Sequence, residues 1–139
     1  MLFRSGHHIF DNEDLRRQML CISGVDLHGI ERIRHQGVAI GAEVLDTSEW
    51  IGRFAEILLQ RTGKMPILVP RATIKTHICG RPNVKDGNVR SALIERFGEP
   101  GTKKAPGMLY GVHHDEWQAL AGAVYVYDTV LEPLERLLG

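Results

Sequence analysis

The pattern that most constrains the fold is a pair of short apolar runs separated by a long helical pattern. Residues 25–33 read VDLHGIERI, and residues 65–69 read MPILV. Between them, residues 41–61 place Val44, Ile51, Phe54 and Leu58 at helical spacing. Two strands joined by a helix form a βαβ unit, whose strands run parallel. The sequence therefore predicts an α/β fold built on two short parallel strands, the first of them buried.

Helical patterns also flank this unit. We expect one helix from residue 13 to about residue 22, a short one over 71–79, another over 85–97, and a last one starting near His114 or Asp115. Residues 98–111 are rich in Gly, Pro and Lys and predict a long irregular loop. A sheet of two strands is marginal by itself. Either the chain contains strands that the pattern does not reveal, or a partner supplies them.

Length and composition limit the class of protein. The 139 residues, 43% apolar and 24% charged, predict one globular domain over residues 1–139. No apolar run approaches the roughly 20 residues that span a bilayer, and the first residues lack the apolar core of a signal peptide. Cys21 and Cys79 form neither a metal-ligand spacing nor a disulfide framework. We therefore expect a cytoplasmic protein without a membrane partner.

Charge is unevenly distributed although the net charge is zero. Residues 64–104 hold nine basic and three acidic residues, a net charge of +6, and the remainder carries −6. This asymmetry favours a basic face for phosphates beside an acidic region that could hold a metal ion. The candidate phosphate-binding residues are Lys75, Lys85, Arg90, Lys103 and Lys104. The alternative is an ordinary solvated surface.

Two acidic residues are candidates for catalysis. Glu31 lies near the end of the first strand, where open α/β sheets place their sites, although it could instead be a surface residue paired with Arg32 or Arg34. Asp115 begins the last helix, where an aspartate often serves only as a cap. Two-metal phosphodiester hydrolysis requires three or four carboxylates, and these would be two of them. His114 could add a nitrogen ligand or be exposed polar surface.

A resemblance to a known family rests on a combination of short runs. They are IERI at 30–33, GAEVLDT at 41–47, WIGRF at 50–54, PRATIK at 70–75, KDGNVR at 85–90, GTKKAPG at 101–107, LYGV at 109–112 and the segment 115–121. Together they cover about residues 24–128, and they resemble the phage branch of RuvC-like Holliday junction resolvases.

The resemblance implies a ribonuclease H-like fold, a homodimer, and magnesium- or manganese-dependent nicking of branched DNA. It implies that Glu31 is the catalytic glutamate of a strand end and that Asp115 is a catalytic acid on the last helix. Lys75 and Lys85 match lysines that approach the junction backbone. Because some relatives use a histidine ligand on this helix, His114 is a candidate metal ligand.

The sequence departs from the family in three ways. The family opens with three antiparallel strands, the first carrying an aspartate in an Asp-Pro-Gly-like turn, whereas this chain begins at the helix before the Glu31 strand. Gln118 stands where many relatives carry a second acid, and His113 and His114 replace small residues. We therefore expect a partial, N-terminally truncated ribonuclease H-like fold with two parallel strands and four to five helices.

The function implied by the resemblance is structure-selective endonuclease activity that resolves Holliday junctions in DNA recombination or phage DNA processing. Because the first catalytic aspartate is missing, enzymatic activity of this chain remains open. The alternative is a non-catalytic module for branched-DNA binding or dimerisation, or a decayed remnant.

Overall fold

A computed structural model describes residues 11–22, 27–34, 37 and 39–139. Its elements are α1 (Asn12–Leu20), β1 (Gly29–Arg32), α2 (Ala42–Thr62), β2 (Ile67–Pro70), α3 (Arg71–Cys79), α4 (Asp86–Phe97), α5 (Glu116–Val126), the π-helical turn η1 (Tyr127–Leu131) and α6 (Glu132–Leu138). Because α5, η1 and α6 follow one another without a break, the described part holds five helical rods and two strands. This order confirms the mixed α/β class and the predicted succession of elements.

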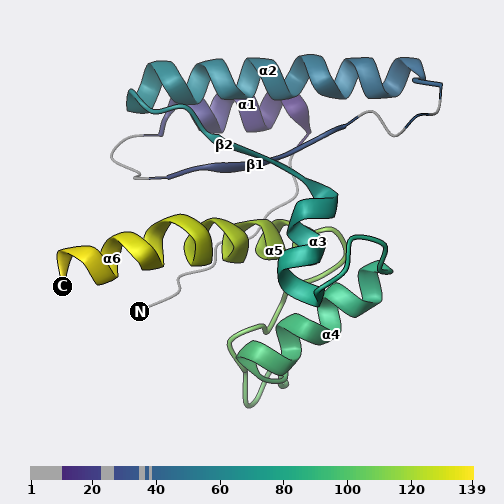
Figure 1. The fold of residues 1–139 in the computed structure, drawn as a ribbon, viewed down its shortest axis with the longest axis vertical. Helices are drawn as coiled ribbons and strands as arrows, with labels where there is room; N and C mark the ends of the chain where they lie inside the picture. Colours follow the sequence, from purple (N-terminus) through teal and green to yellow (C-terminus); the bar gives the residue numbers. More distant parts are fainter. Residues whose placement is uncertain (1–10, 23–26, 35–36, 38) are drawn as a thin grey trace.

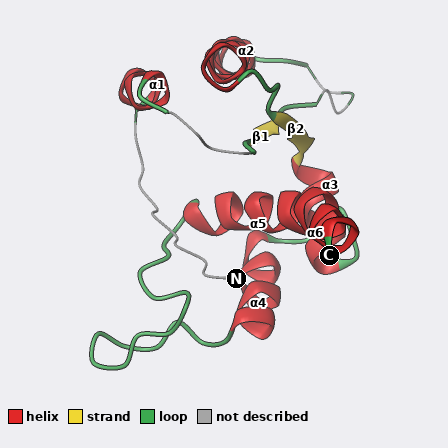
Figure 2. Ribbon diagram, turned by 90° about the vertical axis from the view of Figure 1, so that its left-hand side faces the viewer, coloured by secondary structure: helices red, strands yellow, loops and turns green. Residues whose placement is uncertain are grey.

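The two strands form a parallel sheet, as the βαβ pattern predicts. Glu31 lies opposite Val69, and Arg32 lies opposite Pro70. The sheet lies between two helical layers (Figure 1): α1 and α2 cover one side, and the rod of α5 to α6 runs along the other. Viewed from the side, α1 lies beyond the edge of β1 (Figure 2), so the upper helical layer is wider than the sheet beneath it.

The first strand differs from its prediction in length and in burial. The strand covers Gly29–Arg32, and residues 25 and 26 of the predicted run lie outside the described part of the chain. The expectation of a buried strand is wrong, because only Ile30 is half-buried and the other three residues are exposed. In the described part of the chain, β1 is paired on one edge only, which leaves its other edge without a neighbouring strand.

A compact core lies among α3, α4 and α5. Leu93, Val89 and Ala121 are fully buried there. Trp117 belongs to the same cluster. The long segment between α4 and α5 contributes Leu109 and Val112, so it is anchored to this core.

The sequence predicted a long irregular loop over residues 98–111. Part of this segment instead forms a tight turn. Thr102 and Ala105 exchange main-chain hydrogen bonds of 3.0 and 3.1 Å, and Gly101 forms a bridge with Pro106. Gly101 has a φ of +75°, and a Cβ atom there would collide with the carbonyl oxygen of Ala105. The turn thus requires glycine at this position.

Two expectations from composition can be compared with the structure. Among the described helices, none has both the length and the apolar character needed to cross a bilayer. Cys21 is exposed, Cys79 is half-buried, and both are free thiols.

Candidate functional site

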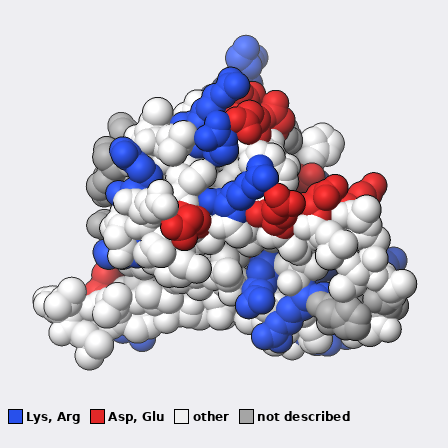
Figure 3. All heavy atoms as spheres, turned by 90° about the horizontal axis from the view of Figure 1, so that it is seen from above, with Lys and Arg blue, Asp and Glu red and all other residues white. Residues whose placement is uncertain are grey.

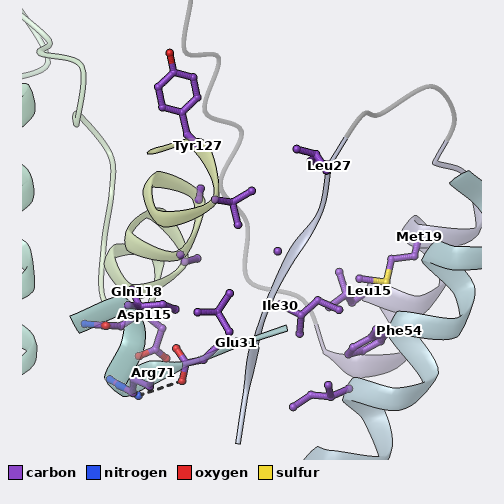
Figure 4. A pocket seen from close by; sticks show the side chains of 18 of the residues that line it. Leu15, Met19, Leu27, Ile30, Glu31, Phe54, Arg71, Asp115, Gln118 and Tyr127 are labelled. Atoms are coloured by element: carbon purple, nitrogen blue, oxygen red, sulfur yellow. Dashed lines mark ion pairs between the residues drawn. The ribbon is translucent and has the colours of Figure 1, made fainter. Parts of the chain in front are cut away.

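A pocket of about 1080 Å³ opens beside β1, between the two helical layers (Figure 4). One wall comes from α1 and α2, the other from α5, η1 and α6, and β1 lies between them. The apolar residues of this pocket include Leu15, Met19, Leu27, Ile30, Ile51, Phe54, Val69, Ile74, Val126 and Leu131. Its charged residues are Glu31, Arg71, Asp115 and Glu135.

Helix α5 faces the pocket with one side and the core with the other. Asp115, just before the helix, and Gln118, Ala119, Gly122, Ala123 and Val126 line the pocket. They recur at helical spacing and form one stripe along the helix. The opposite side carries Trp117, Ala121 and Val124 into the core. The small residues Ala119, Gly122 and Ala123 lie on the pocket side, where they leave room.

Glu31 and Asp115 lie at the same pocket although they are far apart in the chain. Glu31 comes from β1 and Asp115 from the turn before α5. Figure 4 shows the two carboxylates pointing toward one another. The side chain of Glu31 is 39% exposed, so solvent and ions can reach it. The fold therefore brings together the two acids that the sequence singled out.

The cap explanation for Asp115 does not hold. Asp115 occupies the position before α5, but its side chain makes no capping hydrogen bond. The carboxylate of Glu116 instead accepts a hydrogen bond of 2.7 Å from the main-chain N–H of His113. Because its neighbour fulfils the capping role, the Asp115 carboxylate is available to the pocket.

The ion-pair partner of Glu31 is Arg71, which follows directly after β2. Its guanidinium lies 3.9 Å from the Glu31 carboxylate and 2.8 Å from that of Asp86, and Lys75 approaches Asp86 to 3.0 Å. Hydrogen bonds from Lys75 and then Arg71 lower the pKa of Asp86. The sequence had named Arg32 and Arg34 as alternative partners of Glu31. The parallel register explains why Arg71 is the partner. It places the end of β2, which Arg71 follows directly, beside Glu31.

The five candidate phosphate-binding residues differ in their surroundings. Lys75 is only 14% exposed, and its ammonium also donates a 2.7 Å hydrogen bond to the Val84 carbonyl. Arg90 lies 5.2 Å from the ring centre of Trp117. Lys85, Lys103 and Lys104 are exposed and form no ion pair within the described part of the chain.

The surface charge is mixed on the face covered by α1 and α2. Figure 3 shows basic and acidic side chains interspersed there. The predicted basic face does not lie on this side of the molecule. Lys103 and Lys104 instead lie in the tight turn between α4 and α5, which presents them to solvent.

His114 does not line the pocket that Glu31 and Asp115 share. It is exposed and has a φ of +43°. Within the described residues, no group of three or more histidine, cysteine or acidic side chains is arranged to hold a metal ion. Gln118 brings an amide to the pocket, and its Nε2 atom is buried without a hydrogen-bond partner among the described groups.

A second polar cluster joins three helical segments outside the pocket. Asp128 in η1 accepts hydrogen bonds of 2.6 and 2.7 Å from Arg96 in α4, and it contacts His77 in α3 at 2.7 Å. The hydrogen bond from Arg96 lowers the pKa of Asp128 most, against the effect of burial, and the pKa of Arg96 is raised in turn. Sequence patterns gave no signal for this cluster, because its members are far apart in the chain.

Sequence reasoning also missed Arg71 as the neighbour of Glu31, and it missed the pocket itself. The predicted parallel pairing could have pointed to Arg71, since it follows the second strand directly. No family model, curated protein or solved structure matches this chain. The candidate site therefore rests on its residues and their geometry.

Proposed function

We propose that this protein is a magnesium-dependent, structure-selective endodeoxyribonuclease that acts on Holliday junctions and other branched DNA in recombination or phage DNA processing. The observation that supports this proposal is the meeting of Glu31 and Asp115 at one open pocket. Paired carboxylates in an accessible cleft are typical ligands of hard divalent cations. The resemblance of the sequence runs to RuvC-like resolvases gives the substrate class.

The two carboxylates fit a magnesium ion that shares its coordination with substrate. Magnesium is often held by one or two protein carboxylates, keeps several waters and binds substrate phosphate. Glu31 and Asp115 would hold it, and manganese would use the same oxygens. When bound, the ion would polarise the phosphodiester and lower the pKa of a coordinated water.

The other parts of the chain would position the DNA. Lys85, Lys103 and Lys104 are exposed cations suited to backbone phosphates. Arg71 is held by Asp86 at 2.8 Å, so it keeps a partner when a cation takes up Glu31. A homodimer would present two such sites, as cutting two strands of a junction requires.

Nicking of a synthetic four-way junction in magnesium tests the proposal. Wild-type protein is expected to nick the junction and not a linear duplex of the same sequence. Glu31→Gln and Asp115→Asn should each abolish nicking, because each removes one of two charged ligands. Glu95→Gln is the matched control, since Glu95 is exposed on α4 away from the pocket. Undiminished nicking by Glu31→Gln would refute the assignment.

A second function, junction binding without cleavage, is favoured by a specific observation. Glu31 and Asp115 meet at the pocket, and Gln118, the next pocket-lining residue of α5 after Asp115, contributes an amide where a further carboxylate would be needed. Two-metal hydrolysis uses a larger set of carboxylates. In this alternative, the protein holds branched DNA through its cations and cuts nothing.

Salt-dependent binding to the junction separates the two functions. In the alternative, wild-type protein binds without nicking, and Lys103→Ala/Lys104→Ala makes the negative slope of log K against log salt shallower by up to about 2. Arg53→Ala/Arg61→Ala on α2 is the matched control, because it removes equal charge from the opposite layer. Equal slopes for the two double variants would exclude the turn as a DNA contact.

A further inference from the structure

We propose that the pocket beside β1 is a docking groove for an extended β-strand of a second polypeptide, apolar on both of its faces and basic near one end. Such a strand would pair with the edge of β1 that faces away from β2. The groove includes Glu31 and Asp115, the proposed metal ligands, but its test requires neither DNA nor a metal ion.

The main chain of β1 provides the first argument. Ile67 donates a 2.8 Å hydrogen bond to the His28 carbonyl, and the parallel register pairs Gly29 with Ile67. Because main-chain groups alternate sides along a strand, His28 and Ile30 point toward β2, while Gly29 and Glu31 point their N–H and C=O groups the other way. In the described part of the chain the sheet ends there. An edge of this kind is a template for strand addition.

The walls of the groove provide the second argument. Leu15 and Met19 of α1 belong to one wall, and Ala119 and Ala123 of α5 to the other. Figure 2 shows α1 beyond the edge of β1, with α5 on the opposite side of the sheet plane. The space between two helical layers, level with a strand, suits another strand of the same sheet. Since both walls are mainly apolar, that strand must be apolar on both faces.

Polar groups of the groove distinguish a peptide from other occupants. Among the described residues, three carboxylates line it, those of Glu31, Asp115 and Glu135, against one cation, that of Arg71. This charge disfavours the carboxylate of a fatty acid, and it favours a lysine or arginine near one end of the strand.

A labelled synthetic peptide tests the proposal directly. The probe is fluorescein-Lys-Val-Ile-Val-Ile-Val-Lys-amide. Two control peptides carry N-methyl groups on alternate residues, and they differ in which set of alternate residues is methylated, so that each tests one pairing register. N-methylation keeps the side chains and removes the donors that pair with β1. We expect saturable binding by fluorescence polarisation in buffer without divalent cations, with at least one N-methylated control weaker by about tenfold or more.

Variants of the protein locate the binding site. Ala123→Phe fills the groove from α5 and should weaken peptide binding by about tenfold, whereas Ala105→Phe, in the exposed turn, should leave it unchanged. Circular dichroism and thermal unfolding check that both variants fold. As a measurement that needs no variant, amide exchange of Gly29 and Glu31 in the wild-type protein should slow when peptide binds.

Specific results would overturn the proposal. They are absence of peptide binding up to millimolar concentration, equal binding of both N-methylated controls, and no slowing of exchange at Gly29 and Glu31. Displacement of the peptide by decanoate at equal affinity would identify a lipid site instead. Protection of the same amides in a peptide-free dimer, detected by sedimentation, would identify a second copy of the chain as the occupant. Nicking activity can fail or succeed without changing any of these results.

Discussion

The two sides of α5 contrast sharply. On one side, Ala121 and Val124 pack with Leu93 in a core that excludes solvent almost completely. On the other, Ala119 and Ala123 line an open pocket that also exposes one edge of the sheet. The same helix thus closes one region and leaves the other open. We therefore expect the lobe of α3, α4 and α5 to carry most of the stability.

The largest expected effect contrasts a core leucine with a groove leucine. Leu93→Ala should lower the free energy of unfolding by about 3 kcal/mol, because it leaves a cavity in a fully buried site. Leu15→Ala, in the half-buried groove wall, should cost less than about 1 kcal/mol. Urea unfolding followed by circular dichroism measures both. Equal losses would mean that the α1 side is as tightly packed as the lobe.

The next effect concerns the polar cluster that ties η1 to the lobe. Asp128→Asn should lower the free energy of unfolding by about 2 kcal/mol at neutral pH, because it removes a two-pronged charged hydrogen bond with Arg96. Asp46→Asn, on the exposed surface of α2, is the matched control and should change it by less than about 0.5 kcal/mol.

The same cluster predicts a pH dependence of stability. The pKa of Asp128 is lowered from 3.8 in the folded protein, and so is that of Asp86, which lies outside this cluster beside Arg71 and Lys75. At pH values between the folded and unfolded pKa, the unfolded state binds more protons, so stability rises with pH. The contribution is complete above the unfolded value and is lost as pH falls through the folded one. Thermal unfolding between pH 6 and pH 2.5 should show a smaller acid loss for Asp128→Asn, and an unchanged loss would contradict the role of Asp128.

The smallest expected effect tests how closely the sheet approaches α5. A Cβ atom on Gly29 would lie 2.9 Å from Cγ2 of Val126. Gly29→Ala should therefore cost about 1 kcal/mol, because valine has little freedom to rotate in a helix. Combining it with Val126→Ala should cost less than the sum of the two single changes, as a double-mutant cycle would measure. Additive losses would mean that β1 and α5 are not in tight contact.

Local patterns determined a large part of the fold. Helix α3 has the predicted bounds, and the two strands pair in parallel. These features depend on spacing, capping and chain connectivity, which are written in neighbouring residues. The ribonuclease H-like assignment, the metal and the DNA partner remain predictions, because they came from the resemblance and from residue type.

The sequence by itself singled out Glu31 and Asp115, because each is a carboxylate at the end or start of an element. It could not determine that Glu116 performs the capping, that Arg71 neighbours Glu31, or that Asp128 joins Arg96 and His77. Those contacts join residues far apart in the chain or depend on the geometry of one turn. Only the tertiary structure decided them, since burial and ion pairing depend on which elements pack together. It also decided that β1 is exposed, because a second neighbouring strand is absent from the described sheet.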